Sequence, residues 1–188
     1  MKRRIWDYLL VALLIIGLAA FVVVVSLRQD APDLSNYQVF YGSKIDSIEA
    51  AKEFALAFSK VAPSEVEFEL EEFDPSKKAY IFEYGNDNRS YSCQIDSENG
   101  IIEKYEFDGT LPSFAMRNDI MGQEEICAIV MAIDPTVNRS SILMHMDKFD
   151  DDNLTVYEGE ATGEEYFYKF EFHVSSGLIL EWSTAKVK

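Results

Sequence analysis

The sequence predicts an α+β protein with an N-terminal transmembrane helix followed by two tandem units, each a helix packed on an antiparallel sheet of about four strands. Three observations predict this. The chain after its first thirty residues repeats at a spacing of 77 positions, and an uncharged stretch runs from Tyr8 to Leu27. In each repeat, apolar residues at helical spacing are followed by segments that alternate with a period of two. The predicted boundaries are 1–28 for a cytoplasmic start and transmembrane anchor, 29–45 for a linker, 46–108 for the first unit, 109–120 for an inter-repeat linker and 121–188 for the second unit.

The repeat matches aromatic, aliphatic and turn residues, which are the residues that fix a core and its bends. None of the matched residues is an obvious nucleophile, base or metal ligand, so the duplication copies a scaffold. The matched pairs are Tyr80 and Tyr157, Glu83 and Glu160, Tyr91 and Tyr168, Ile95 and Phe172, Gly100 and Gly177, Ile101 and Leu178, Ile102 and Ile179, and Tyr105 and Trp182.

The first segment has a basic start, Lys2-Arg3-Arg4, followed by an apolar run long enough to cross a bilayer core of roughly 30 Å. The positive-inside rule keeps the basic start in the cytoplasm and places the chain after Arg28 outside, so we expect a single-pass protein of the cell membrane. A cleaved signal peptide is the alternative, but its apolar region is usually shorter, roughly 7–15 residues, and Leu18-Ala19-Ala20 matches a cleavage site poorly. The sequence leaves open whether the N-terminal segment is cleaved.

The first predicted unit begins with a helix that Asp46 caps, with Glu49 three residues later as in a capping box. Its apolar face comprises Ile48, Ala51, Phe54, Ala55, Phe58 and Val61, and Pro63 follows its end. Four strands follow. The first has Val66, Phe68 and Leu70 on one face and glutamates on the other; the next inward rows are Tyr80, Phe82 and Tyr84, then Tyr91, Cys93 and Ile95, and the last strand is 101–107.

The second predicted unit has the same order of elements. Gly122 and Glu125 are expected at the start of its helix, and Asp134-Pro135 is expected to end it. Its strands are expected at 142–146, 154–161, 166–174 and 178–182.

Each unit closes with a turn and strand, 95–102 and 172–179, that resembles the PepSY domain. The resemblance covers 46–107 and 121–183, and the second copy departs from the motif because His173 replaces an aspartate. PepSY domains have no catalytic residues of their own. They occur in propeptides of secreted metallopeptidases, which they are thought to restrain, and in membrane-tethered envelope proteins. In architecture the chain is also similar to the TseB-type cell-wall elongation regulators of Gram-positive bacteria.

The net charge is −16. Such an acidic surface repels nucleic acid and anionic headgroups and suits a cationic partner or bound cations. The alternative, which we prefer, is that the acids keep an exported domain soluble.

The sequence offers no set of residues typical of catalysis. The only histidines are His145 and His173, and the two cysteines, Cys93 and Cys127, fit buried free thiols better than a disulfide. There is no HExxH motif, nucleophile elbow or phosphate-binding glycine loop, so we expect no enzyme, no cofactor and no metal. The acidic segment 147–153 lacks the spacing of a calcium loop, which leaves a solvated hairpin loop as the preferred interpretation. A weak transition-metal site between His145 and His173 is a lesser alternative.

These observations and the resemblance together predict a non-catalytic, membrane-anchored, extracytoplasmic protein of the bacterial envelope that engages or restrains another extracytoplasmic protein, such as a peptidase or a wall-synthesis enzyme. The alternative is a structural or sensory ectodomain that holds cations or wall polymer on its acidic surface. Phe167 is the predicted partner contact, because it lies on the opposite parity from Tyr168, Phe170 and Phe172, which we expect to be core. The oligomeric state stays open.

Overall fold

The computed structural model describes residues 41–111, 120–149 and 154–187, which belong to one compact unit, Leu34–Lys188. The first half of this unit contains α2 (Ile48–Ser59), a 3-10 turn (Pro63–Glu65), β1 (Glu67–Asp74), β2 (Ala79–Asn86), β3 (Arg89–Asp96) and β4 (Ile102–Gly109). The second half contains α3 (Gln123–Ile133), a 3-10 turn (Arg139–Ser141), β5 (Ile142–Phe149), β6 (Leu154–Thr162), β7 (Tyr166–His173) and β8 (Ile179–Lys186).

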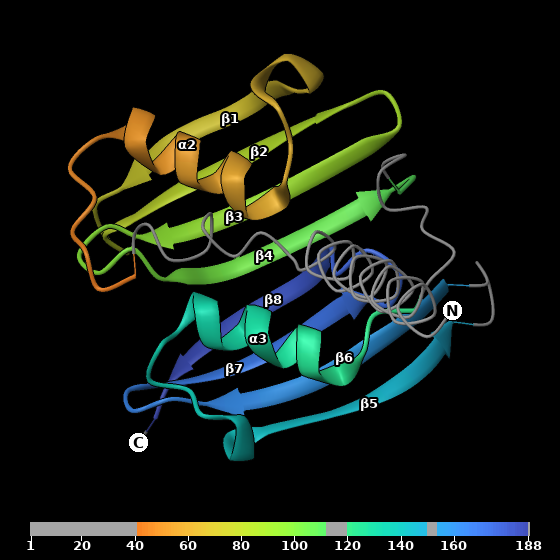
Figure 1. Ribbon diagram of the computed structural model, residues 1–188. Helices are drawn as coiled ribbons and strands as arrows, with labels where there is room; N and C mark the ends of the chain where they lie inside the picture. Colours follow the sequence, from red (N-terminus) through yellow and green to blue (C-terminus); the bar gives the residue numbers. More distant parts are fainter. Residues whose placement is uncertain (1–40, 112–119, 150–153, 188) are drawn as a thin grey trace, which may run out of the picture. The chain divides into compact units, whose positions relative to one another are not determined.

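Within the described residues the strands form one eight-stranded antiparallel sheet in the order β1-β2-β3-β4-β8-β7-β6-β5 (Figure 1). The predicted fold class, two tandem units that each have a helix on a sheet of about four strands, is therefore wrong. The last strands of the two halves, β4 and β8, pair with each other. In separate units each would have been an open edge with unpaired backbone groups, and pairing removes both edges.

The junction between the halves is symmetric. Tyr105 lies directly opposite Trp182, and these two residues are themselves a matched pair of the repeat. Lys104 faces Ser183 and Glu106 faces Glu181 on either side of them. A local twofold axis therefore passes between Tyr105 and Trp182, and the duplicated chain forms within itself the kind of self-complementary contact that a symmetric dimer makes.

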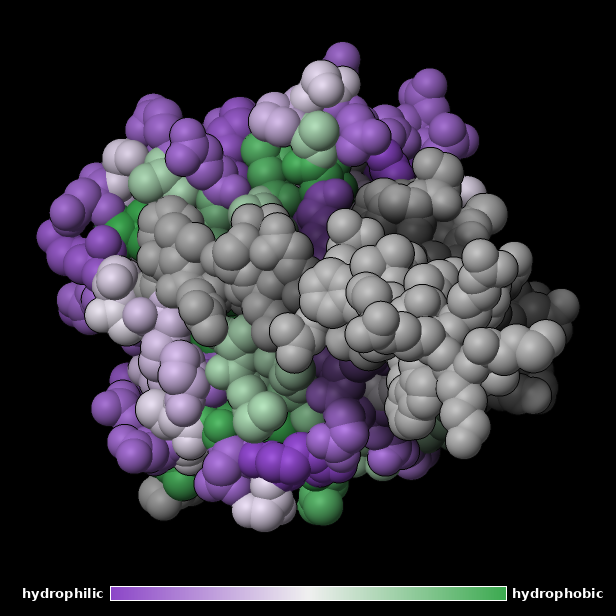
Figure 2. All heavy atoms as spheres, viewed as in Figure 1, coloured by the Kyte–Doolittle hydropathy of each residue, from purple (hydrophilic) through white to green (hydrophobic). Residues whose placement is uncertain are grey.

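Both helices pack on the same face of the sheet, over one continuous core (Figure 1). Phe58 of α2 reaches the junction, with its ring centroid 5.1 Å from that of Tyr105 and 6.1 Å from that of Trp182. Viewed from the helix side, hydrophilic residues gather toward the upper and lower edges of the view, and patches of hydrophobic residues are visible inside them (Figure 2). The shared core is the second reason why the halves do not behave as separate units.

The glycines of the repeat occupy equivalent turns. Gly100 has φ 68° and Gly177 has φ 61°, a left-handed conformation that glycine adopts without steric cost. Each donates its backbone N–H over 2.9 Å to the residue four positions earlier, Asp96 in one half and His173 in the other. The prediction that these two glycines correspond is confirmed.

The helix starts differ in part from those expected. Ser47, not Asp46, caps α2, since its Oγ accepts the Ala50 N–H at 3.1 Å. The start of α3 lies where the sequence predicted it, and there the Glu125 carboxylate accepts the backbone N–H of Gly122 at 2.6 Å. Glycine cannot cap with a side chain, so the glutamate alone makes this contact.

A β-bulge between Phe68 and Leu70 overturns the alternation expected for the first strand. It places Glu71 on the helix face, where its carboxylate lies 2.6 Å from the Lys52 ammonium group of α2. The same ammonium group lies 3.8 Å from the centre of the Phe68 ring. A period-two pattern cannot show an inserted residue, because the residue shifts the parity of everything after it.

The described helices have 12 and 11 residues, whereas a membrane span needs about 20. Among the described residues no helix is both long and apolar enough to cross a membrane. On this finding we correct the predictions of a transmembrane helix, of an integral membrane protein with one span, and of a single-pass location with a cytoplasmic N-terminus. The predicted span, 1–28, lies outside the described residues.

Candidate functional site

The face of the sheet that the helices leave open carries a line of acidic residues. Glu106 of β4 lies opposite Glu181 of β8, which lies opposite Glu171 of β7, which lies opposite Glu158 of β6. We call these four residues the glutamate row. Successive side chains of a strand point to opposite faces. Tyr105 and Trp182 point into the core beneath the helices, so the adjacent Glu106 and Glu181, and with them the row, point to the other face. Beyond the last member of the row, Glu158 of β6, lies His145 of β5, which is directly opposite Glu158.

Like charges directly opposite each other on one face of a sheet are destabilising. Two members of the row have a base nearby: the Lys104 ammonium lies 3.2 Å from Glu106, and His145 Nε2 lies 3.6 Å from Glu158 Oε2. Within the described part of the chain, neither Glu171 nor Glu181 forms an ion pair. Burial raises the pKa of the half-buried Glu171, and the negative charges of Glu181 and Glu158 raise it further.

A surface hollow of about 430 Å³ lies over this part of the sheet. It is lined by Glu158, Glu171 and Glu181 together with His145, and by Leu143, which is 70% exposed. Lys104 and Lys169 also line the hollow, but their ammonium groups lie 3.2 Å from Glu106 and 3.8 Å from Glu160, and the acids of the lining still outnumber them. The hollow therefore combines excess acid with an exposed apolar side chain, a composition suited to a ligand that is cationic and partly apolar.

The twofold relation between the halves provides an internal control. The local axis relates the glutamate row to Ser183, Lys104, Gln94 and Ile81, which also lie side by side across the sheet. That related line contains no acid. The scaffold therefore tolerates neutral and basic residues at these positions, and the fold does not require the glutamates.

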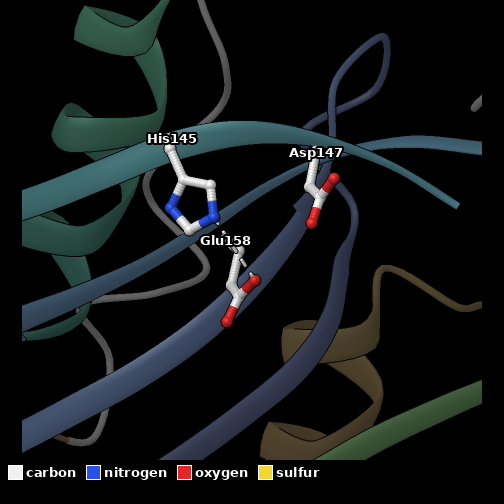
Figure 3. A group of neighbouring side chains, drawn as sticks. All are labelled: His145, Asp147 and Glu158. Carbon is white, nitrogen blue, oxygen red and sulfur yellow. Dashed lines mark ion pairs between the residues drawn. The ribbon is translucent and has the colours of Figure 1, made fainter.

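Three potential metal ligands meet at the end of the glutamate row. His145 and Asp147 project from β5 and Glu158 from β6, all toward the same side of the sheet (Figure 3). One ligand atom from each lies within 4.8 Å of the others, and all three residues are exposed. The sequence predicts His145 as a metal ligand only together with His173. The structure instead places Asp147 and Glu158 beside His145.

His173 lies in a different environment from His145. It is 8% exposed, opposite Val156 in the ladder, and its Nδ1 lies 3.0 Å from Ser176 Oγ. Burial lowers the pKa of its imidazole. The alternation of the strands predicts that both histidines point outward and lie at the surface. His145 is exposed as predicted, whereas His173 lies on the outward parity but is buried, so its surface position is wrong. Of the acidic segment considered as a calcium loop, residues 150–153 lie outside the described residues, and Asp147 belongs to β5.

Phe167, the predicted partner contact, lies on β7 on the same open face as the glutamate row. It is half-buried and sits between Thr162 and Ala185 in the ladder. Glu171 lies four positions further along the same strand, which is about 13 Å away. Its role in binding stays a prediction.

Both cysteines are free and buried, as expected from the sequence. Burial raises the pKa of the Cys93 thiol and that of the Cys127 thiol, so both stay neutral at physiological pH.

Sequence reasoning missed the glutamate row. Each glutamate could be recognised as an outward residue of its own strand. Their alignment depends on the register of three strand pairs, and one of these is the pairing of β4 with β8, which no local pattern specifies.

The comparisons with known proteins assign no family. No protein-family model matches the chain, and no curated protein matches it in sequence. The solved structures include a protein described as "a putative lipoprotein" from Clostridium difficile 630, with 18% sequence identity and a TM-score of 0.29, over 83% of this chain and 100% of that one. The resemblances to the PepSY domain and to the TseB-type regulators receive no support from these comparisons.

Proposed function

We propose that this chain is a non-catalytic binding protein of the bacterial envelope, which acts outside the cytoplasm and engages a basic segment of another protein through its open sheet face. The observation that carries the proposal is the glutamate row, with four adjacent acids facing one another across four strands. A protein gains no stability from this arrangement, because opposed like charges repel. Binding of a cationic segment would relieve the repulsion.

The surroundings of the row favour a protein segment over a bare ion. Leu143 is 70% exposed beside it, and the half-buried Phe167 lies on the same face. Apolar and aromatic side chains supply much of the binding energy in protein interfaces, while charged groups set specificity and the rate of association. A segment with lysine or arginine beside apolar residues would match both features.

The location outside the cytoplasm has separate support. The basic start at Lys2 and the uncharged stretch from Tyr8 to Leu27 are typical of segments that direct a chain to export. The acidic composition fits an exported domain that stays soluble. The PepSY-like turn and strand elements favour a peptidase or a wall-synthesis enzyme as the partner.

The experiment is a crosslinking pull-down from intact cells that produce either the native chain or a charge variant. The variant carries Glu158→Gln, Glu171→Gln and Glu181→Gln, which remove the charge and keep the size. The matched control carries three changes of the same kind on the exposed edge strand β1, Glu67→Gln, Glu69→Gln and Glu72→Gln.

We expect the native chain and the β1 control to capture the same protein and the row variant to lose it. Capture should also weaken as salt increases, because exposed charges are screened. Equal capture by the row variant and the native chain would contradict the proposal. Loss of capture in both variants would show a response to net charge and not to this face.

A further inference from the structure

We propose that His145, Asp147 and Glu158 bind one zinc ion at the β5 end of the sheet. This site stands independently of the protein partner proposed above, because it rests on the geometry of three side chains and not on the remainder of the glutamate row.

The arrangement of the strands brings the ligands together. His145 and Glu158 face each other across β5 and β6, and Asp147 lies two residues further along β5 and therefore on the same face. His145 Nε2 lies 3.6 Å from Glu158 Oε2. Two ligands of a tetrahedral zinc ion are roughly 3.4 Å apart when each bond is about 2.0–2.1 Å, so this pair is already close to the required separation.

The third ligand needs only a small adjustment. All three ligand atoms lie within 4.8 Å of one another, and the three side chains are exposed, so rotation about their side-chain bonds is not blocked by a packed core. Three protein ligands leave a fourth position for water or for a group supplied from outside, as in zinc sites that are not purely structural.

The ligand types select the metal. An imidazole nitrogen with two carboxylates suits zinc and its transition-metal neighbours. Calcium requires six to eight oxygen ligands, which two carboxylates do not supply, and magnesium prefers oxygen as well. The nearby Glu171 adds negative charge, since it lies opposite Glu158 on the same face. We therefore expect zinc to bind and calcium not to compete.

The test is a calorimetric titration of the full-length chain with zinc chloride, after removal of bound metal with a chelator. The chain should carry no histidine tag, so that its own two histidines are the only ones present. It should be kept in a mild detergent, because the stretch Tyr8–Leu27 is uncharged and mostly apolar. We expect one zinc per chain, with affinity lowered at least tenfold by His145→Ala and by Glu158→Gln. Glu160→Gln is the matched control, since Glu160 is also exposed on β6 and lies two residues from Glu158; it should bind like the native chain.

A second measurement covers variants that fold poorly. The chain has two histidines, so proton NMR of the native protein gives two sets of imidazole signals, and the set that is lost in His145→Ala belongs to His145. Zinc should shift the His145 signal and leave the His173 signal in place. The proposal is wrong if the native chain binds no zinc, if His145→Ala binds as tightly as the native chain, or if Glu160→Gln weakens binding as much as Glu158→Gln does.

Discussion

The two halves of the described unit share a scaffold and differ in what they display on it. Both have a helix followed by four strands, a left-handed glycine before the last strand and a large aromatic residue at the junction. On the open face the first half carries Gln94 and Ile81 where the second carries Glu171 and Glu158. The residues that fix the core and the turns recur, whereas the acids of the glutamate row do not, so the functional residues of this protein are expected where the two halves differ.

The halves also differ where each helix ends. In the first, Ser59 Oγ lies 2.9 Å from the Tyr84 hydroxyl. In the second, a fully buried carboxylate, Asp134, accepts hydrogen bonds from the Tyr168 hydroxyl at 2.6 Å and from Thr136. Burial and, next, the hydrogen bond to Asp134 raise the pKa of Tyr41 to about 12. A buried charge depends on its partners more than a buried hydroxyl does.

The largest effect is expected at the junction, with Trp182→Ala. The indole is 1% exposed and contacts Phe58, Tyr168 and Phe170, so its removal should cost about 3–5 kcal/mol of unfolding free energy. Because one sheet and one core join the halves, helix content and aromatic fluorescence should be lost together in urea. Two separated transitions would show that the halves unfold independently.

The next largest effect compares the two helix ends. Asp134→Ala leaves the Tyr168 hydroxyl and the Thr136 N–H without their acceptor and should cost about 1–3 kcal/mol for each group left unsatisfied. Ser59→Ala, at the matching end of α2, should cost only about 1 kcal/mol. Urea unfolding of both variants measures the difference, and equal losses would remove the distinction between the two ends.

A smaller effect on stability, but a clear one on binding, is expected for Phe167→Ala. Phe167 is half-buried on the open face, and the equivalent position of the first half is Ser90. Interface energy concentrates in a few large aromatic residues, so partner capture should weaken by roughly 2 kcal/mol while the melting temperature changes little. Ser90→Ala is the control and should change neither. A large loss of melting temperature in Phe167→Ala would make Phe167 a packing residue.

The smallest effect, opposite in sign, is expected for Glu171→Gln, which makes the second half resemble the first at Gln94. The raised pKa of Glu171 means that the folded chain holds this proton more strongly than the unfolded chain does. The stability that Glu171 contributes is therefore present below the ordinary carboxyl pKa and lost as pH rises through the folded-state value. Removing the charge should stabilise the protein by about 0.2–1 kcal/mol at pH 7 and give no gain in acid.

Thermal unfolding at pH 7 and in acid measures this gain. Glu160→Gln serves as the control, because Glu160 lies 3.8 Å from the Lys169 ammonium and should gain nothing. A Glu171→Gln protein less stable than the native chain at pH 7 would show that the glutamate row serves the fold.

The sequence by itself determined the elements that depend on local pattern. Apolar spacing located α2 and α3, alternation located the strands, and the spacing of 77 residues identified Gly100 and Gly177 as equivalent. It also indicated that the cysteines are buried and free. Propensity, periodicity and turn chemistry act over a few residues, which is why these features could be read without a structure.

Only the tertiary structure decided how the halves combine and where the charges meet. The pairing of β4 with β8 joins segments far apart in the chain, and the bulge in β1 shifts its parity without any change in composition. The glutamate row exists because the registers of neighbouring strands bring one glutamate from each of four strands into line. Strand register is fixed by the fit of whole sheets and cores, and a shift of one residue would have turned these same glutamates toward the opposite face.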